Sequence, residues 1–506
     1  MKKFTRILCI LLTCLMVVTI LACNSSDGGG DNKTTSDNKA TADGETGGDD
    51  NVGDSANTTE EEVKMDGVTM IASLPDADYE GYEFRIWTSN WFNETLEGRQ
   101  APEEEQISEP INDALYIRDK LVEEKYKIDI KYTIVDDYNT LTSRATKSVK
   151  AGDDSFDFVM GDMMNVTKGL AQTGAVCDFN TIPNIDLSNP WWSQFAIRDL
   201  TINGKFFFPT GDITARYPGS QAMIFFNKQI FLDAGIDYPY QSVLEGTWTL
   251  DAFRTLLKDT TRDLDGDGVY GKDDFYGFIG NSSGYNLYRS AGESLVKIVD
   301  GEPVINVNSE KSQTVINELM SFMGQENYMY YNSAFQSYDE VPMFKENRMM
   351  MMIQTGTNAS LYRDMESDFG IIPIPKFNEM QTDYNSFCQA WGSAAVCVPR
   401  TNENLERTGM IIEALAAVGK YTSTPAAYEV TLKTKYSRDN DSEEMLDIIV
   451  AGSCYDLAMM FDWGTLYSSF YKNMDQGLSF VSKYESIEAK VQAAMDKTVN
   501  VFMSVE

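Results

Sequence analysis

The sequence contains no histidine among its 506 residues. This absence excludes a Ser-His-Asp or Cys-His catalytic centre and a zinc site with histidine ligands. It does not exclude chemistry by paired carboxylates, which most glycosidases use. Any catalysis by this chain would therefore rest on groups other than imidazole.

Basic residues are also scarce, because 42 lysines and arginines stand against 77 aspartates and glutamates, for a net charge of −35. A field of this sign disfavours binding to nucleic acid and to anionic lipid. It says little about a neutral ligand. We interpret the acidity as a source of solubility at a cell surface.

Long apolar runs are missing except at the N-terminus. Lys2, Lys3 and Arg6 precede an apolar run at 7–22 in which Thr13 and Thr19 are the only exceptions. A basic start followed by an apolar stretch is typical of an export signal. The run is short for a spanning helix of about 20 residues, so an uncleaved anchor helix is the weaker interpretation.

Leu21-Ala22-Cys23 and the small polar residues after it resemble the bacterial lipobox. The resemblance implies cleavage of residues 1–22 and lipid attachment to Cys23. Residues 23–65 then carry no aromatic side chain and are rich in Gly, Ser, Thr, Asn and Asp. Such a segment cannot bury enough apolar surface to fold. We predict a disordered acidic tether, anchored to the outer face of the cytoplasmic membrane of a Gram-positive-like cell.

The remaining cysteines do not define a disulfide framework. Cys9 and Cys14 leave with the signal and Cys23 is the lipid site, which leaves Cys177, Cys388, Cys397 and Cys454. An exported chain permits disulfides. Cys388 and Cys397 are near enough in sequence to pair across a tight loop, but other pairings are equally allowed. Each thiol is also compatible with a buried apolar position.

Residues 66–506 are too many for one core and predict two lobes of α/β type. Strands alternate with helices, which indicates a parallel or mixed sheet with helical crossovers. Ligands of such sheets bind beyond the carboxyl ends of the strands. The expected strands are 84–87, 128–135, 156–160, 205–209, 222–227, 349–354 and 371–375, and the expected helices are 111–126, 138–151, 230–234, 250–259 and 405–421.

Several segments, in this order, resemble the extracellular solute-binding proteins that serve carbohydrate ABC importers. They are Phe156-Asp157-Phe158-Val159, 205–209, Ile224-Phe225-Phe226-Asn227-Lys228 with Ala234-Gly235-Ile236, Thr247-Trp248-Thr249 with 250–253, Phe344 with 348–351, and 370–375. The resemblance implies a periplasmic-binding-protein-like fold of the class II type with a ligand cleft between its lobes. It also implies a carbohydrate ligand captured by hinge closure, a membrane permease as partner, a monomeric state and no enzymatic activity.

The same resemblance implies the lobe boundaries. Chain crossings are expected near residues 210, 370 and 420. Residues 66–212 and 370–420 would form the first lobe, and 213–369 and 421–506 the second. The sequence departs from the family where many sugar binders place a tryptophan, because 354–358 hold no aromatic residue. One stacking wall is therefore absent or supplied elsewhere.

A sugar site needs aromatic planes for C–H faces and polar groups for hydroxyls. The candidates at strand ends, in loops or near crossings are Trp87, Trp91, Asp162, Asp212, Arg216, Trp391 and Trp463. For each tryptophan the alternative is a place in the core, and for Asp162 it is a helix N-cap. Arg216 has an ion pair as its alternative. Trp191 and Trp192 are interpreted as packing or rim residues, and Trp248 as a structural residue at a helix entry.

Residues 263–274 have the spacing of a calcium loop. Asp263, Asp265 and Asp267 occupy alternate positions, a glycine permits the sharp turn, and the Val269 carbonyl adds a ligand. Asp274 stands where glutamate is usual. We predict a structural calcium ion, with an acidic surface turn as the alternative. No catalytic cofactor is expected.

Three other functions remain open at this point. An oligopeptide-binding receptor would share the anchor, the size and the two lobes, but would bind peptide main chain. A surface glycoside hydrolase would use two carboxylates. An adhesin or structural wall protein is disfavoured because the chain shows no repeats.

Overall fold

The computed structural model describes residues 65–90, 100–103, 105–280, 282–323, 329–330, 340–362, 364–428 and 440–505. The predicted signal segment, Cys23, nearly all of the tether, and Trp91 lie outside the described residues. Within the described part, no helix combines the length and the hydrophobicity that crossing a bilayer requires.

One sheet has four strands in the order β12-β3-β1-β2. Its strands are β1 (Tyr82–Ser89), β2 (Ile128–Val135), β3 (Phe158–Asp162) and β12 (Ala394–Cys397). β1 runs parallel to both β2 and β3, and β12 joins the edge antiparallel to β3. β3 and β12 are buried along their whole length, including Asp162 at the end of β3.

A second sheet has five strands in the order β10-β4-β9-β5-β8. Its strands are β4 (Ala222–Asn227), β5 (Tyr276–Ile279), β8 (Met329–Tyr330), β9 (Met349–Thr355) and β10 (Phe369–Ile372). β4 pairs antiparallel with β9 and β10, whereas β5 runs parallel to β9. Residues 205–209, expected as a strand, instead form an irregular buried segment, because they bond singly to Phe179 and Val396 rather than to a ladder.

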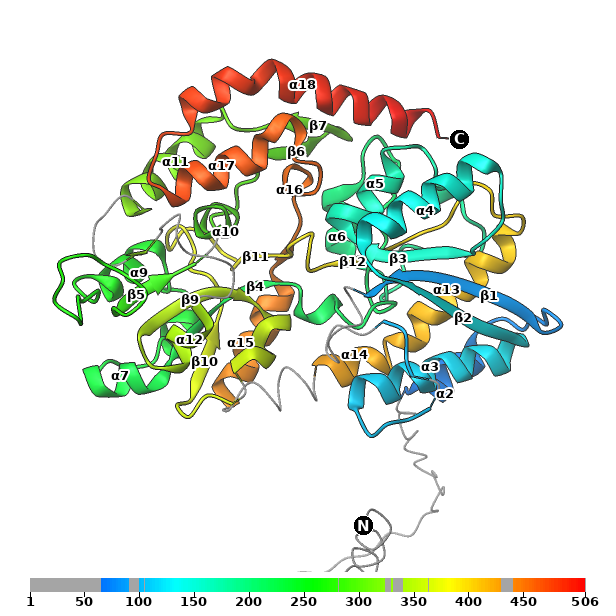
Figure 1. The fold of residues 1–506 in the computed structure, drawn as a ribbon, viewed down its shortest axis with the longest axis horizontal. Coiled ribbons are helices and arrows are strands. Elements are labelled where there is room, and N and C mark those ends of the chain that lie inside the picture. The colour runs from blue at the N-terminus through cyan, green and yellow to red at the C-terminus, as the bar shows by residue number, and fades with distance from the viewer. Residues whose placement is uncertain are drawn as a thin grey trace, which may run out of the picture. The chain divides into compact units, whose positions relative to one another are not determined.

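Helices cover both sheets (Figure 1). Those around the first sheet include α2 (Gly67–Ser73), α3 (Pro110–Tyr126), α4 (Tyr138–Ala151), α5 (Lys168–Ala171), α6 (Gln194–Leu200), α13 (Leu405–Gly419) and the short turns η2 (Met163–Thr167) and η3 (Phe179–Thr181). Those of the second lobe include α7 (Lys228–Ala234), α8 (Tyr240–Leu244), α9 (Leu250–Leu257), α10 (Ser283–Ser290), α11 (Glu310–Met323), α12 (Glu340–Lys345), η5 (Gly356–Tyr362) and α15 (Asn440–Ala451).

Helix ends follow ordinary capping chemistry. The Asp137 carboxylate accepts hydrogen bonds from the N–H groups of Asn139 and Thr140 and begins α4. Gly152, at φ 78°, ends the same helix in the left-handed conformation that glycine adopts without strain. Thr249 begins α9 in the same manner as Asp137 begins α4.

The chain crosses between the lobes in segments that bond to one another. A small parallel sheet pairs β11 (Ser386–Phe387) with β13 (Ser453–Cys454), and β11 lies between the two larger sheets (Figure 1). Gln389 N–H donates to Ser220 O at 3.2 Å, and Gln221 Nε2 donates to Ser453 Oγ at 3.0 Å. Three crossing segments therefore share one hydrogen-bonded junction.

Two expected lobe boundaries are corrected by these contacts. Residues 370–372 belong to the second lobe, not the first, because β10 pairs with β4. The chain stays there through Lys376, whose N–H donates to Trp248 O, and crosses only at β11. At the other boundary, Ile213 O accepts from Arg118 of α3 at 3.1 Å, so the first lobe extends past 212.

The C-terminal helices also depart from the expected division. They are α16 (Leu457–Phe461), η7 (Trp463–Thr465), α17 (Leu466–Asp475) and α18 (Val481–Met503). α17 packs against α10 and α11 of the second lobe. The end of α18 packs on the first lobe instead, because the ring of Phe502 lies 4.4 Å from that of Phe207 and Thr498 bonds to Gln172. α18 thus contacts both lobes, through α17 at one end and Phe207 at the other.

Candidate ligand site at the crossing segments

Asp162 ends β3, and only one of its two carboxylate oxygens has a hydrogen-bond partner among the described residues. Oδ1 accepts the Asn165 N–H at 2.6 Å and caps η2, which confirms the N-cap interpretation. Oδ2 is buried and has no hydrogen-bond partner among the described residues. Burial raises the pKa of Asp162 to about 6, and hydrogen bonding with Asn165 and the charge of Lys168 only partly offset this rise. A buried oxygen without a partner is costly, so it is a natural acceptor for a ligand hydroxyl.

Trp391 lies on a turn that sits directly against the start of η2. Ala390 O accepts the N–H groups of Met163 and Met164, and Ser393 O also accepts from Met163. This turn leads into β12, where Ala394 pairs with Asp162. Trp391 is half-buried, whereas the other tryptophans of the described part are buried, each at most 8 % exposed. Trp391 is thus the aromatic plane available beside the Asp162 strand end.

Arg216 reaches the same turn from another crossing segment. It precedes η4 (Tyr217–Gly219), is 9 % exposed, and its Nε donates to Gly392 O at 3.1 Å. The structure therefore links Asp162, Arg216 and the turn that carries Trp391, because β12 pairs with β3 and the Arg216 side chain bonds to the backbone of that turn. A carboxylate, a guanidinium and an indole are groups that suit a polyhydroxylated ligand.

Further polar atoms near these segments are buried without a hydrogen-bond partner in the described part of the chain. They are Thr88 Oγ1 at the end of β1, Thr214 Oγ1 and Gln221 Oε1 in the first crossing, and Ser386 Oγ in β11. Sequence reasoning missed all four, because hydroxyls and amides are common in any loop. Their place at strand ends and crossings was the one available signal.

Asp212 has a structural role at the third crossing, next to α13 and α14 (Ser423–Pro425). Its carboxylate accepts the Thr424 hydroxyl at 2.7 Å and lies 3.6 Å from Lys420 Nζ. Burial raises its pKa to about 6. Gly419 approaches closely, because a Cβ there would lie 2.1 Å from Asp212 O. Asp212 therefore fastens two crossing segments together and is not joined to the Asp162 group by a described contact.

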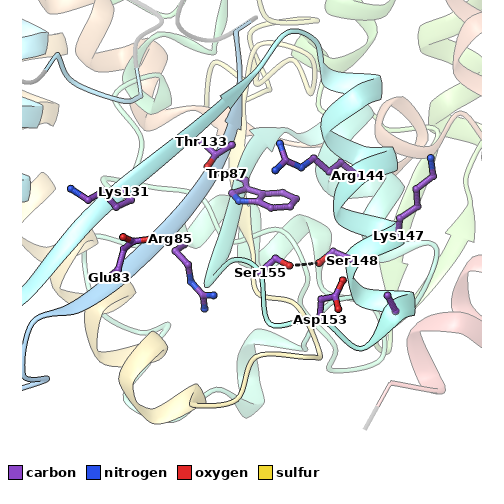
Figure 2. A pocket seen from close by; sticks show the side chains of 11 residues that line it. Glu83, Arg85, Trp87, Lys131, Thr133, Arg144, Lys147, Ser148, Asp153 and Ser155 are labelled. Atoms are coloured by element: carbon purple, nitrogen blue, oxygen red, sulfur yellow. Dashed lines mark hydrogen bonds between the residues drawn. The ribbon is translucent and has the colours of Figure 1, made fainter.

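Trp87 and Trp463, two further residues of the predicted site, are buried. The Trp463 ring is 2 % exposed, stacks on Phe461 at 4.7 Å, and donates its N–H to Thr498 at 2.9 Å. It packs between C-terminal helices and presents no open face. Trp87 is 5 % exposed and lies between the Phe156 ring and the Arg144 guanidinium, on the side of the first sheet that faces α4. Both rings are therefore buried, as the core alternative describes, and Trp87 also lines a hollow beside α4 (Figure 2).

The residues interpreted as packing are confirmed. The indole N–H groups of Trp191 and Trp192 donate to the two oxygens of the buried Glu413, at 3.0 and 2.9 Å. Trp248 donates to Pro373 O at 2.9 Å. Polar tips of buried aromatic rings require such partners.

All four cysteines of the described chain are buried free thiols. Cys388 has Cys454 as its backbone neighbour, with the Cys388 N–H donating to Cys454 O at 2.8 Å, whereas Cys397 lies in β12 of the first sheet. Burial raises the pKa of the Cys177 thiol to about 11 and that of Cys388 to about 12. Protonated, buried thiols of this kind are unreactive.

The acidic loop after α9 brings part of the predicted calcium set together. One carboxylate oxygen from each of Asp263, Asp265 and Asp267 lies within 4.8 Å of the others. Asp274 is not part of this group, because its two oxygens accept the N–H groups of Leu264 and Gly271. Val269 donates its N–H to Asp267 at 2.7 Å. Three of the five predicted ligands are therefore grouped.

The fold is shared with solved structures, although no protein-family profile and no curated protein matches the sequence. A cyclo/maltodextrin-binding protein complexed with maltotetraose aligns at 12% identity with a TM-score of 0.53, over 83% of this chain and 96% of that one. The maltose-binding periplasmic protein MalE of Listeria monocytogenes, in complex with maltose, aligns at 13% identity and a TM-score of 0.52, over 83% and 97%. M. tuberculosis UspC aligns at 14% identity with a TM-score of 0.53, over 81% of this chain and 100% of that one. This chain has the fold of a two-lobed solute-binding protein.

The solute-binding-protein fold confirms the predicted α/β architecture. In open α/β sheets ligands bind beyond the carboxyl ends of the strands, which is where the junction described above lies. Asp162, Arg216 and Trp391 lie where β3 ends and the chain passes between the lobes.

Proposed function

We propose that this protein captures an oligosaccharide between its two lobes and delivers it to an ABC importer. The observation that carries this proposal is the fold, shared over 83% of the chain with a maltodextrin-binding protein. The site chemistry supports it, because Trp391 offers a plane for a sugar face and Asp162 Oδ2 an acceptor for a hydroxyl. Capture by closure of two lobes is the ordinary motion of such proteins.

The proposed role is binding and not hydrolysis. The neighbours are binding proteins by their descriptions. Asp162 and Asp212 also do not form a described glycosidase pair, because Asp212 is held by Thr424 and Lys420 and is not joined to Asp162 by a described contact. We therefore expect the bound saccharide to be released unchanged.

The N-terminal sequence supports an extracytoplasmic location. A basic start, an apolar run and the lipobox-like Leu21-Ala22-Cys23 favour export, cleavage and lipid attachment at Cys23. The acidic segment after Cys23 would lift the body away from the membrane, where the protein acts as a monomer and meets its permease. Mass spectrometry of the mature protein, with a diacylglyceryl-modified Cys23 as N-terminus, tests this part of the proposal.

We also propose a structural calcium ion at Asp263, Asp265 and Asp267. A hydrogen bond from the Asp267 N–H lowers the pKa of Asp265, but desolvation and the neighbouring carboxylates outweigh it and raise that pKa. A divalent cation would relieve this repulsion. Isothermal calorimetry of the chain with Ca²⁺, and with an Asp265→Asn and Asp267→Asn variant, tests it. Equal heats for both proteins would contradict the proposal.

The function is tested by thermal unfolding of the unacylated chain, with Cys23→Ser, against neutral mono- and oligosaccharides and short peptides. A ligand that binds only the folded state raises the melting temperature as its concentration increases. A rise with a saccharide that is recovered intact supports the proposal. A rise with peptides alone would identify an oligopeptide receptor, and a cleaved saccharide would identify a hydrolase.

A further inference from the structure

Helix α18 packs on both lobes and extends from α17 toward α5 (Figure 1). Its 23 residues correspond to a length of roughly 34 Å. It contains neither glycine nor proline, the residues at which long helices bend most readily. The segments that cross at the hydrogen-bonded junction are instead short strands and irregular stretches, which can absorb changes of backbone angle. α18 therefore joins the lobes through an element that bends less readily than the crossings.

The first half of α18 is held to the second lobe through α17. The ring of Tyr484 lies 6.1 Å from that of Phe480, which packs on Phe470 of α17 at 4.9 Å. Phe470 in turn lies 4.9 Å from the ring of Tyr288 in α10. The buried carboxylate of Asp475, at the end of α17, accepts two backbone N–H groups at the start of α10, at 2.9 and 2.8 Å. This half is therefore fastened to the second lobe by ring packing and by buried hydrogen bonds.

The second half of α18 is held to the first lobe by an apolar contact centred on Phe502. This residue is fully buried, and its ring lies 4.4 Å from that of Phe207 and 6.2 Å from that of Phe208. Both partners belong to the irregular segment 205–209, which leads into the first crossing. One turn earlier, the Thr498 hydroxyl accepts the Gln172 side-chain N–H at 3.4 Å. Phe502 therefore anchors α18 on the first lobe.

The chain enters α17 through a sharp turn that leans on the middle of α18. The preceding helix α16 packs on η2 of the first lobe, and the turn has positive φ at Asp462, Gly464 and Thr465, of 43°, 58° and 74°. A Cβ at Gly464 would lie 2.6 Å from the backbone N of Val491, so the turn contacts α18 directly. Left-handed backbone at residues other than glycine persists where the surrounding structure enforces it. The turn and α18 thus form one packed unit between the lobes.

We propose that α18 is a strut that limits the relative motion of the two lobes, with Phe502 as its anchor on the first lobe. Because the helix has no residue at which it bends readily, a change in the lobe arrangement must shift one of its ends over the surface on which that end packs. Such a shift costs buried contacts, so α18 restricts the lobe arrangements that the protein adopts without ligand. The inference concerns the ligand-free protein and would stand if the proposed oligosaccharide function failed.

The experiment measures the distance between the lobes in the ligand-free chain. Cys9, Cys14 and Cys23 are replaced by serine. Spin labels are attached to Lys131→Cys in β2 and to Asp251→Cys in α9, because both positions are exposed. The four cysteines of the described chain are buried, so the labels react with the introduced thiols. Double electron–electron resonance then gives the distribution of distances between the two labels.

The test variant is Phe502→Ala. The matched control is Phe344→Ala in α12, because this ring is equally buried and its ring contacts, with Tyr362 and Phe369, lie within the second lobe. We expect Phe502→Ala to widen the distance distribution about twofold and Phe344→Ala to leave it unchanged. An unchanged width in the test variant, or equal widening in both variants, would overturn the proposal.

Both alanine variants leave a cavity in a packed region, so thermal unfolding is used to establish that each is folded at the temperature of the measurement. If Phe502→Ala does not fold, Phe502→Leu and Phe344→Leu replace the pair. Leucine keeps part of the packing, so we expect a smaller widening for Phe502→Leu and again none for Phe344→Leu. Equal widths in these two variants would overturn the proposal in the same way.

Discussion

Replacing Asp162 by asparagine should change stability and ligand affinity in opposite directions. Burial raises the pKa of this carboxyl from 3.8 to about 6, so the folded chain holds the proton more tightly than the unfolded chain. Stability contributed by this group is complete below pH 4 and is lost as the pH rises through 6. With about 1.4 kcal/mol for each pH unit between the two pKa values, the loss at pH 8 reaches about 3 kcal/mol.

Asparagine caps helices as well as aspartate does and carries no charge to desolvate. Asp162→Asn should therefore raise the free energy of unfolding by about 1–3 kcal/mol at pH 8 and leave it nearly unchanged at pH 4. The same substitution should weaken oligosaccharide binding by about 1.5–3 kcal/mol, because a charged acceptor for a ligand hydroxyl is lost. Urea unfolding at the two pH values and titration calorimetry measure the two effects.

A matched control is Asp186→Asn. The Asp186 carboxylate is exposed and accepts from Ser188, whose hydroxyl and N–H lower its pKa. This variant should gain no stability at pH 8 and should bind ligand normally. The reasoning would be refuted if Asp162→Asn destabilised the fold equally at both pH values, or if it left the affinity unchanged.

Three further predictions follow from the described contacts. Trp391→Ala should weaken oligosaccharide binding at least tenfold in calorimetry and change the urea midpoint little. Trp463→Ala should instead lower the free energy of unfolding by about 3–5 kcal/mol, because its ring is buried against Phe461. Reversed effects of the two variants would contradict the assignment of Trp391 to the ligand site. Burial raises the pKa of Asp475 to about 7, so the free energy of unfolding should fall as the pH rises from 4 to 7. Asp475→Asn should reduce that fall in urea titrations. The same pH dependence in the variant would contradict this prediction. Terbium luminescence should report binding at Asp263, Asp265 and Asp267 and vanish in the double variant of Asp265 and Asp267; persistent signal would place the ion elsewhere.

Much of the fold could be predicted because the hydrophobic periods are clear. The alternation at 128–135 and the apolar run at 222–227 coincide with β2 and β4, and the pattern at 138–151 coincides with α4. The segment 205–209 misled the prediction, because three consecutive buried phenylalanines also fit a strand. Its hydrogen bonds go to separate segments, and no local pattern records that.

The candidate site was harder to predict, since it depends on pairing between distant segments. Trp391 and Trp463 each follow a polar or small residue in a loop and look equivalent in sequence. Packing separates them, because η7 is covered by α18 while the turn at Trp391 lies on η2. The predicted lobe boundary at 370 was wrong for a related reason, because the chain after β10 still contacts Trp248 of the second lobe, through Pro373 and Lys376.

The central claim is that this chain binds a neutral oligosaccharide at the junction of Asp162, Arg216 and Trp391. The most direct test is an array of unmodified oligosaccharides incubated with the fluorescently labelled, unacylated chain and with its Trp391→Ala variant. The account predicts binding to a related set of saccharides that the variant loses. Absence of binding across the array, or binding that the variant retains in full, would contradict it.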